Sequence, residues 1–263
     1  MMKPINDFPR EKCAAVTYLL TDIDDTITHH GRIPACAFQA MEDLDAAGIR
    51  VIPITGRPAG WCDHIARMWP VKAVVGENGA FYFLYDNRSK RMIRRYFKTA
   101  QEREQDQEKL AVIKHEILTS IPGCVVSADQ RYREADLAID FAEDVPHLSQ
   151  KDIDRIVTLF EHHGATAKVS SIHVNGWFGT YDKLSMTKIL FREAFKTDLD
   201  SIKENVIFSG DSPNDEPMFE YFPNAVGVAN VLAFKDRLSF KPAWITKEKG
   251  GMGFAQLAKI LVS

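Results

Sequence analysis

Three carboxylates lie close together in one short segment of the chain. Asp22, Asp24 and Asp25 follow the apolar run Val16–Leu20 within the segment "LLTDIDDTIT". Acidic groups this close repel one another, and burying them is costly unless a positive charge lies between them. A hard cation such as Mg²⁺ would relieve that repulsion and would keep several waters for a phosphate group. One carboxylate could act as the nucleophile of a phosphoryl transfer and another as its acid and base.

Three further segments carry groups that suit the same chemistry. The triplet Thr55-Gly56-Arg57 follows the apolar run "VIPI", and the segment "GDSPND" (residues 210–215) follows "VIFS". Lys183 opens a segment with a helical pattern. A hydroxyl and backbone amides can donate to phosphate oxygens, and a lysine can balance the charge that gathers on them. Asp211 could share a cation with Asp22 and Asp24.

The elements that must position these groups alternate between strand and helix. The first part of the chain predicts strands at 14–20, 50–55 and 72–76, with helices at 35–48 and 56–70 between them. This rhythm is typical of a doubly wound parallel sheet. Ligands of such sheets bind at the carboxyl ends of the strands. We therefore expect the acidic segments, Thr55 and Lys183 to converge on one edge of one sheet.

The rhythm changes in the middle of the chain. Residues 80–97 predict two strands joined by a polar turn, and the segments that follow predict a long polar helix at 99–123, strands at 123–128, 135–141 and 164–175, and a helix at 149–164. From about Tyr181 the first rhythm resumes. We predict an α/β fold in which a Rossmann-like core, residues 1–84 and 179–263, carries an inserted α+β cap domain, residues 85–178.

These motifs resemble those of the haloacid dehalogenase-like hydrolases. "DIDDT", "TGR", a lysine at a helix start and "GDSPND" occur in the family's order and rough spacing. "GENGA" (residues 76–80) and the long insertion make the chain similar to the Cof-type and sucrose-phosphatase-like branch, which includes mannosyl-phosphoglycerate phosphatases and phosphomannomutases. The motifs lie on the core, and the cap resembles that branch only in size and in its strand and helix content.

The resemblance implies a role for each matching residue. Asp22 would be the nucleophile and Asp24 the general acid and base. The metal site would comprise Asp22, the backbone carbonyl of Asp24, Asp211 and Asp215, with Asp215 orienting waters or Lys183. The residues that would bind the phosphoryl group or the rest of the substrate are Thr55, Gly56, Arg57, Asn78, Lys183 and Asn214.

The chain departs from the family pattern at two positions. Asp25 stands where the family most often has glycine, and we expect it to bond to the backbone rather than to react. Lys183 is followed by Leu184 instead of the glycine usual in this branch, so Lys188 is the alternative phosphate-binding lysine.

The implied function is that of a Mg²⁺-dependent phosphatase acting through an aspartyl-phosphate. Its substrate would be a small phosphorylated metabolite, a sugar phosphate or a sugar-acid phosphate. Two alternatives remain open at this point: a phosphomutase that uses the same nucleophile, and a catalytically idle member that binds a ligand.

Composition fits a small-molecule enzyme. The 263 residues carry a formal net charge of −3, which does not favour a nucleic-acid or membrane-surface protein. We find no signal peptide and no apolar run long enough to span a membrane, so we expect a cytoplasmic protein. The four cysteines lack CxxC spacing and are expected to be reduced. Oligomeric state is left open.

A few other residues are further candidates for the site. His29 and His30 could reach a substrate, but a solvated pair is favoured, as it is for His162 and His163. One face of "SSIHVN" (170–175) could look into the cleft. Arg133 could meet an anionic substrate. Three segments or residues are expected to be structural: the basic run at 88–95 as a solvated hairpin, and Trp61 and Trp69 as packing residues.

Overall fold

A computed structural model describes residues 2–263, and its largest sheet has six strands. All five strand pairs in this sheet are parallel. The spatial order is β1 (Lys3–Pro4), β13 (Trp244–Ile245), β12 (Val226–Gly227), β11 (Val206–Gly210), β2 (Tyr18–Thr21) and β3 (Arg50–Pro53). The predicted α/β fold with a parallel sheet is confirmed.

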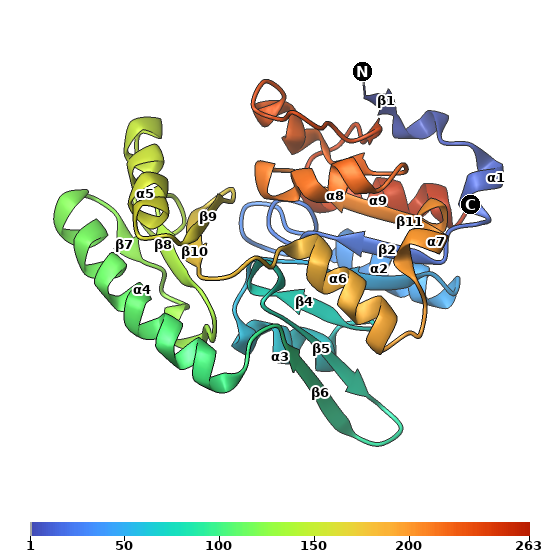
Figure 1. Cartoon of the computed structure of the whole chain (residues 1–263). Helices are drawn as coiled ribbons and strands as arrows, with labels where there is room; N and C mark the ends of the chain where they lie inside the picture. The colour runs from blue at the N-terminus through green and yellow to red at the C-terminus, as the bar shows by residue number, and fades with distance from the viewer. Residues whose placement is uncertain (1) are drawn as a thin grey trace.

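Both faces of this sheet are buried. Leu19 of β2 belongs to one apolar cluster and its neighbour Leu20 to another, because successive side chains of a strand point to opposite faces. Helices α2 (Ala35–Ala46), α3 (Ala59–Met68) and α9 (Gly250–Leu261) contribute to the first cluster. Helices α6 (Lys183–Glu193), α7 (Leu199–Ile202) and α8 (Glu216–Tyr221) contribute to the second. The resulting three-layer arrangement is visible in Figure 1.

A hairpin extends from the edge of the sheet next to β3. Strands β4 (Val74–Gly76), β5 (Phe81–Asp86) and β6 (Arg91–Tyr96) form an antiparallel sheet, and a parallel bridge between Ile54 and Val75 joins it to β3. The two strands predicted at 80–97 are thus confirmed. The predicted domain boundary at 84/85 falls within β5, so the division into two domains stays a prediction.

A second α/β layer lies to one side of the large sheet (Figure 1). Its four antiparallel strands have the order β7 (Val125–Val126), β8 (Leu137–Asp140), β10 (His173–Trp177) and β9 (Thr166–Val169). Helices α4 (Ala100–Ser120) and α5 (Gln150–His162) cover one face with a core of their own. We call residues 100–177 the cap layer. The single strand expected at 164–175 is two strands, because the chain turns at Ser170, whose N–H donates to the carbonyl of His173 over 2.9 Å.

Short elements complete the chain. They are α1 (Arg10–Cys13) and the 3₁₀ turns Ile5–Asp7, Glu77–Gly79, Gln130–Tyr132, Lys203–Asn205, Pro213–Asp215 and Ala229–Phe234. The four cysteines are free thiols, as expected. Within residues 2–263, every helix is either too short or too polar to cross a bilayer.

Candidate active site

The two acidic segments meet because β2 and β11 are neighbouring parallel strands. Thr21 is in register with Ser209, and the N–H of Asp22 donates to the carbonyl of Ser209 over 2.8 Å. Each strand then ends in an aspartate, Asp22 on one and Asp211 on the other. Both carboxylates are buried, with 4% and 1% of their surface exposed. The convergence that the sequence predicts is therefore found at this sheet edge.

Lys183 enters the site from the first turn of α6. Its Nζ donates to Asp22 Oδ1 over 2.8 Å and to Asp215 Oδ1 over 2.7 Å, and its side chain is 2% exposed. Gly79 allows this approach, since its φ of +109° suits glycine and a Cβ there would clash with the carbonyl of Asp182, the residue that caps α6. Lys188, the alternative lysine, instead pairs with Asp200 at the surface.

Three buried carboxylates can share a cation. Asp22, Asp211 and Asp215 each present an oxygen, and these oxygens all lie within 4.8 Å of one another. Burial raises the pKa of Asp22 to about 8 even though Lys183 lowers it, and burial with the nearby Asp215 and Asp22 raises the pKa of Asp211 well above its usual value. One lysine does not balance three acids. A set of hard oxygen donors with surplus negative charge fits Mg²⁺.

Asp22, Asp211 and Asp215 differ in how far their carboxylate oxygens are available to a metal ion. Asp215 Oδ1 accepts from Lys183, and its Oδ2 accepts from the N–H groups of Asp211 and Ser212. Gly210 makes room for that carboxylate, because a Cβ there would clash with Oδ2. Both oxygens of Asp215 are thus engaged within the protein. Asp22 and Asp211 are the carboxylates better placed to ligate an ion directly.

Asp24 is held by Arg57. The guanidinium donates from Nε to both Asp24 oxygens, over 3.1 and 3.0 Å, and from its second amino group over 2.8 Å. Arg57 also reaches Glu143 over 2.8 Å and Asp129 over 3.4 Å, and these two acids belong to the cap layer. Trp61 packs against the guanidinium, which lies 4.4 Å from its ring centre. Arg57 therefore connects the proposed acid–base residue to the cap layer.

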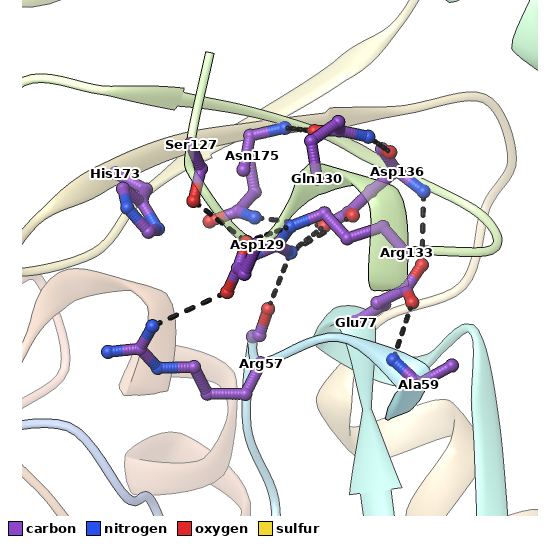
Figure 2. A network of polar contacts seen from close by, with 12 residues as sticks. Arg57, Ala59, Glu77, Ser127, Asp129, Gln130, Arg133, Asp136, His173 and Asn175 are labelled. Carbon is purple, nitrogen blue, oxygen red and sulfur yellow. Dashed lines mark hydrogen bonds and ion pairs between the residues drawn. The ribbon is translucent and has the colours of Figure 1, made fainter. Parts of the chain in front are cut away.

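A second arginine, Arg133, extends from the cap layer to the backbone of the core (Figure 2). Arg133 of the cap layer donates to the backbone carbonyl of Gly56 over 2.9 Å and pairs with Asp129 and Asp136 over 3.0 Å each. Its side chain is fully buried. Asn175 of β10 donates to Asp136 over 2.9 Å. The guanidinium of Arg133 is buried and paired with acids of the protein, so the suggestion that it meets an anionic substrate is wrong.

Glu77 anchors the cap layer through backbone groups, as Figure 2 shows in part. Its carboxylate accepts from the N–H of Ala59 in α3 over 3.0 Å. It also accepts from the consecutive N–H groups of Glu134, Ala135 and Asp136. The side chain is wholly buried, so these donors replace water for the carboxylate. Glu77 thereby joins the sheet edge to the segment before β8.

The remaining predicted residues lie near the site in different ways. Thr55 is buried, and its Oγ1 accepts the N–H of Arg57 over 3.1 Å. Asn78 is buried, and its side chain lies beside Gly56. Its predicted contact with substrate stays a prediction. Asn214 accepts from the hydroxyl of Ser212 over 2.8 Å.

A cavity opens between Asp24 and the cap layer. It has a volume of about 290 Å³, and its polar lining includes Asp24, Asp25, Thr28, His30, Arg57 and Glu143. A narrower recess beside it reaches Asp22 and is lined by Gly56, Ser170, His173, Asn175, Ser212 and Asn214. The segment "SSIHVN" therefore does face the cleft. His30 lines the larger cavity and is exposed, as expected for a solvated residue.

Asp25 adopts a left-handed backbone conformation, with φ +56°. Glycine adopts this conformation most easily and aspartate tolerates it, which accounts physically for the departure noted in the sequence. Its N–H donates to Thr28 Oγ1 over 2.9 Å.

Sequence reasoning missed four polar residues of this region. Glu77 lies inside the "GENGA" segment that drew attention to Asn78, so that segment was a usable signal. Asp129 and Glu143 stand in polar turns, and His173 was noted only as part of "SSIHVN". No local pattern distinguishes these turn acids from solvated ones, since only tertiary folding brings them to Arg57.

Comparisons with known proteins bear on the family and the fold of this chain. A sequence profile described as haloacid dehalogenase-like hydrolase matches residues 19–169. No curated protein matches the sequence. Similar solved structures include a protein from Thermoplasma acidophilum, at 19% identity, TM-score 0.71 and coverage of 94% of this chain and 98% of that one. The sucrose-phosphatase of Synechocystis sp. PCC6803, solved with sucrose and phosphate, is 14% identical, with TM-score 0.63 and coverage of 93% and 97%.

A third similar structure is the C-terminal domain of Candida albicans trehalose-6-phosphate phosphatase, at 12% identity, TM-score 0.70 and coverage of 100% and 99%. At such identities these structures show a shared fold. The profile covers more than half of the sequence and includes "DIDDT", "TGR" and "GENGA". The chain belongs to the haloacid dehalogenase-like hydrolases.

Proposed function

We propose that this chain, as a phosphatase of that family, is Mg²⁺-dependent and hydrolyses a small phosphorylated sugar or sugar-acid metabolite through an aspartyl-phosphate on Asp22. The observation that carries the proposal is the buried meeting of Asp22, Lys183, Asp211 and Asp215 at the ends of β2 and β11. The similar sucrose-phosphatase and trehalose-6-phosphate phosphatase folds support a sugar phosphate as substrate.

Each side chain of the site would have its own role in such a reaction. Lys183, together with the backbone amides near Gly56 and the hydroxyl of Thr55, would hold the phosphoryl group against Asp22. Asp22 would attack phosphorus while Asp24 protonates the departing oxygen. Asp24 would then take a proton from the water that cleaves the aspartyl-phosphate. Bound Mg²⁺, held by Asp22 and Asp211, would supply positive charge that offsets the negative charge on the phosphate.

Arg57 bears on the acid–base role of Asp24. In the described structure its guanidinium donates three hydrogen bonds to that carboxylate, and both carboxylate oxygens accept at least one of them. Part of this contact would have to loosen for an oxygen of Asp24 to face the leaving group. Glu143 and Asp129 of the cap layer can remain paired with Arg57 when its contact with Asp24 loosens.

Phosphate release from a panel of sugar phosphates, nucleotides and phosphoglycerate derivatives tests the proposal. We expect Mg²⁺-dependent release of inorganic phosphate from at least one sugar or sugar-acid phosphate. Conversion of a sugar phosphate to its isomer without release of phosphate would instead identify a phosphomutase. Absence of release across the panel, with no Mg²⁺ binding, would indicate the idle member.

A further inference from the structure

The cavity beside Asp24 is small and carries surplus negative charge. At about 290 Å³ it lies near the lower end of the range of about 300–1,000 Å³ that is usual for ligand pockets. Three of its lining residues are carboxylates, Asp24, Asp25 and Glu143, and Arg57 is the one lysine or arginine among the lining residues of the described chain. A substrate whose phosphate sits at Asp22 would place its leaving group here or in the adjoining recess.

Arg57 is not free to receive an anion. Its amino groups and Nε already donate to Asp24 and Glu143, and Asp129 lies 3.4 Å away. Arg133, the other arginine near the recess, is fully buried and paired with Asp129 and Asp136. Both guanidinium groups are thus neutralised by acids of the protein itself.

Glu143 is ionised at any pH at which the enzyme would work. Burial would raise its pKa, but the close approach of the His173 ring and the hydrogen-bonded, positively charged guanidinium of Arg57 lower it to about 2. Its side chain remains 28% exposed and lines the cavity. A carboxylate on the substrate would therefore meet a negative charge at this position.

His173 offers a contact for an uncharged group. Its side chain is 4% exposed, and its Nε2 has no partner with hydrogen-bond geometry in the described chain, although it lies 2.9 Å from Glu143 Oε2, within ion-pair distance. The ring lines the recess together with Asp22 and Ser212, and it lies to the left of Asp129 in Figure 2. Ser170 and Asn175 line the same recess. Hydroxyl groups can both donate to and accept from such residues.

We propose that Glu143 is a specificity-determining residue that selects, by charge, substrates with an uncharged, hydroxyl-bearing leaving group over substrates with a carboxylate there. This inference rests on the proposed phosphatase function and narrows it from sugar or sugar-acid phosphates to sugar and polyol phosphates. Like charges brought together at a binding surface suppress binding of the wrong partner, and specific sites use such repulsion alongside favourable contacts with the right one.

Two matched pairs of substrates test the selection. Glycerol 3-phosphate and 3-phosphoglycerate differ by a hydroxymethyl group against a carboxylate, and so do glucose 1-phosphate and glucuronic acid 1-phosphate. With the full chain and Mg²⁺, we expect kcat/KM for phosphate release to favour the neutral member of a pair by at least about tenfold. Equal values, or a preference for the carboxylate, would overturn the inference and leave the phosphatase function standing.

Glu143→Gln keeps the size of the side chain and removes its charge, so it should reduce that preference by about fivefold or more. Asp144→Asn is the matched control, because it removes the same charge from the next residue, which is exposed and does not line the cavity. A preference that is unchanged in Glu143→Gln, or reduced equally in Asp144→Asn, would contradict the role of Glu143.

Binding separates this inference from the proposed function. The Kd of each phosphate for the Asp22→Asn variant with Mg²⁺ is measured by titration calorimetry. Tighter binding of the neutral member, lost in the double variant with Glu143→Gln, would support the charge selection even if the wild type releases no phosphate. Equal binding of both members would overturn the selection whatever the activity.

Discussion

Lys183 Nζ lies 2.8 Å from Asp22 Oδ1, although 161 residues separate the two positions in the chain. The cap layer occupies much of that interval. The contact depends on α6 approaching the sheet edge closely at Gly79, and on the pairing of β2 with β11. It places a cation against the proposed nucleophile inside a buried acidic cluster.

Asp22→Asn is expected to abolish phosphate release and to leave the fold intact. Asparagine has nearly the same shape, but it is not a competent nucleophile toward phosphorus. Release should fall by at least about a thousandfold, and circular dichroism should be unchanged. Near-normal turnover in a folded Asp22→Asn protein would exclude Asp22 as the nucleophile.

Lys183→Met is expected to lower the free energy of unfolding by about 3 kcal/mol or more in the metal-free protein, and to reduce activity strongly. The reason is that Asp22 and Asp215 would lose their buried cation. Urea denaturation measures the change. Lys188→Met is the control, since this lysine is partly exposed and pairs with Asp200 at the surface, a contact worth at most about 1 kcal/mol. Comparable losses in both variants would contradict the site as described.

Removal of divalent metal is expected to abolish phosphate release, and Mg²⁺ should restore it. Mg²⁺ should also raise the Tm of the wild type, because the ion binds the folded acidic cluster and relieves its repulsion. The Asp211→Asn variant should need an Mg²⁺ concentration at least about tenfold higher than the wild type for the same rise in Tm. The exposed Asp236→Asn provides the control. An equal Tm shift in Asp211→Asn and wild type would argue against Asp211 as a ligand.

Arg133→Met is expected to destabilise the protein by about 3–5 kcal/mol, because it leaves Asp129 and Asp136 buried without their partner. Arg131→Met is the control. Arg131 is exposed, and its guanidinium lies over the ring of Tyr132. Its effect should stay within about 0.5 kcal/mol. Thermal and urea unfolding measure both. A small loss for Arg133→Met would mean that the network in Figure 2 contributes little to stability.

Stability should depend on pH through Glu143. Its pKa in the folded protein is lowered from 4.5 to about 2, so the ionised side chain stabilises the folded state above about pH 4.5, and this contribution is lost as pH falls toward 2. The difference in unfolding free energy between wild type and Glu143→Gln should therefore shrink between pH 5 and pH 3, from at most about 3 kcal/mol. Urea titrations across this range measure it. A difference independent of pH would contradict the contacts of Glu143 with Arg57 and His173.

Much of the fold followed from local pattern. The run Tyr18–Thr21 and the run Val206–Gly210 are short and rich in aliphatic and aromatic side chains, and such runs between helical segments form buried parallel strands. The hairpin at 81–96 and the capped helix α4 were visible for similar reasons. The element ends were less clear, as at Ser170, where a single expected strand is two.

The sequence by itself determined which residues share the sheet edge. Asp22, Thr55 and Asp211 each follow a parallel strand, and the rule that such strands end on one edge brings them together without further information. Tertiary structure alone decided how Arg57 and Arg133 are used. Both arginines looked available for an anion. Long-range folding places Asp24, Asp129 and Glu143 around Arg57, and it buries Arg133 together with its sequence neighbours Asp129 and Asp136. The physical reason is that ion pairs between distant segments leave no periodicity in the chain, whereas strands and helices do.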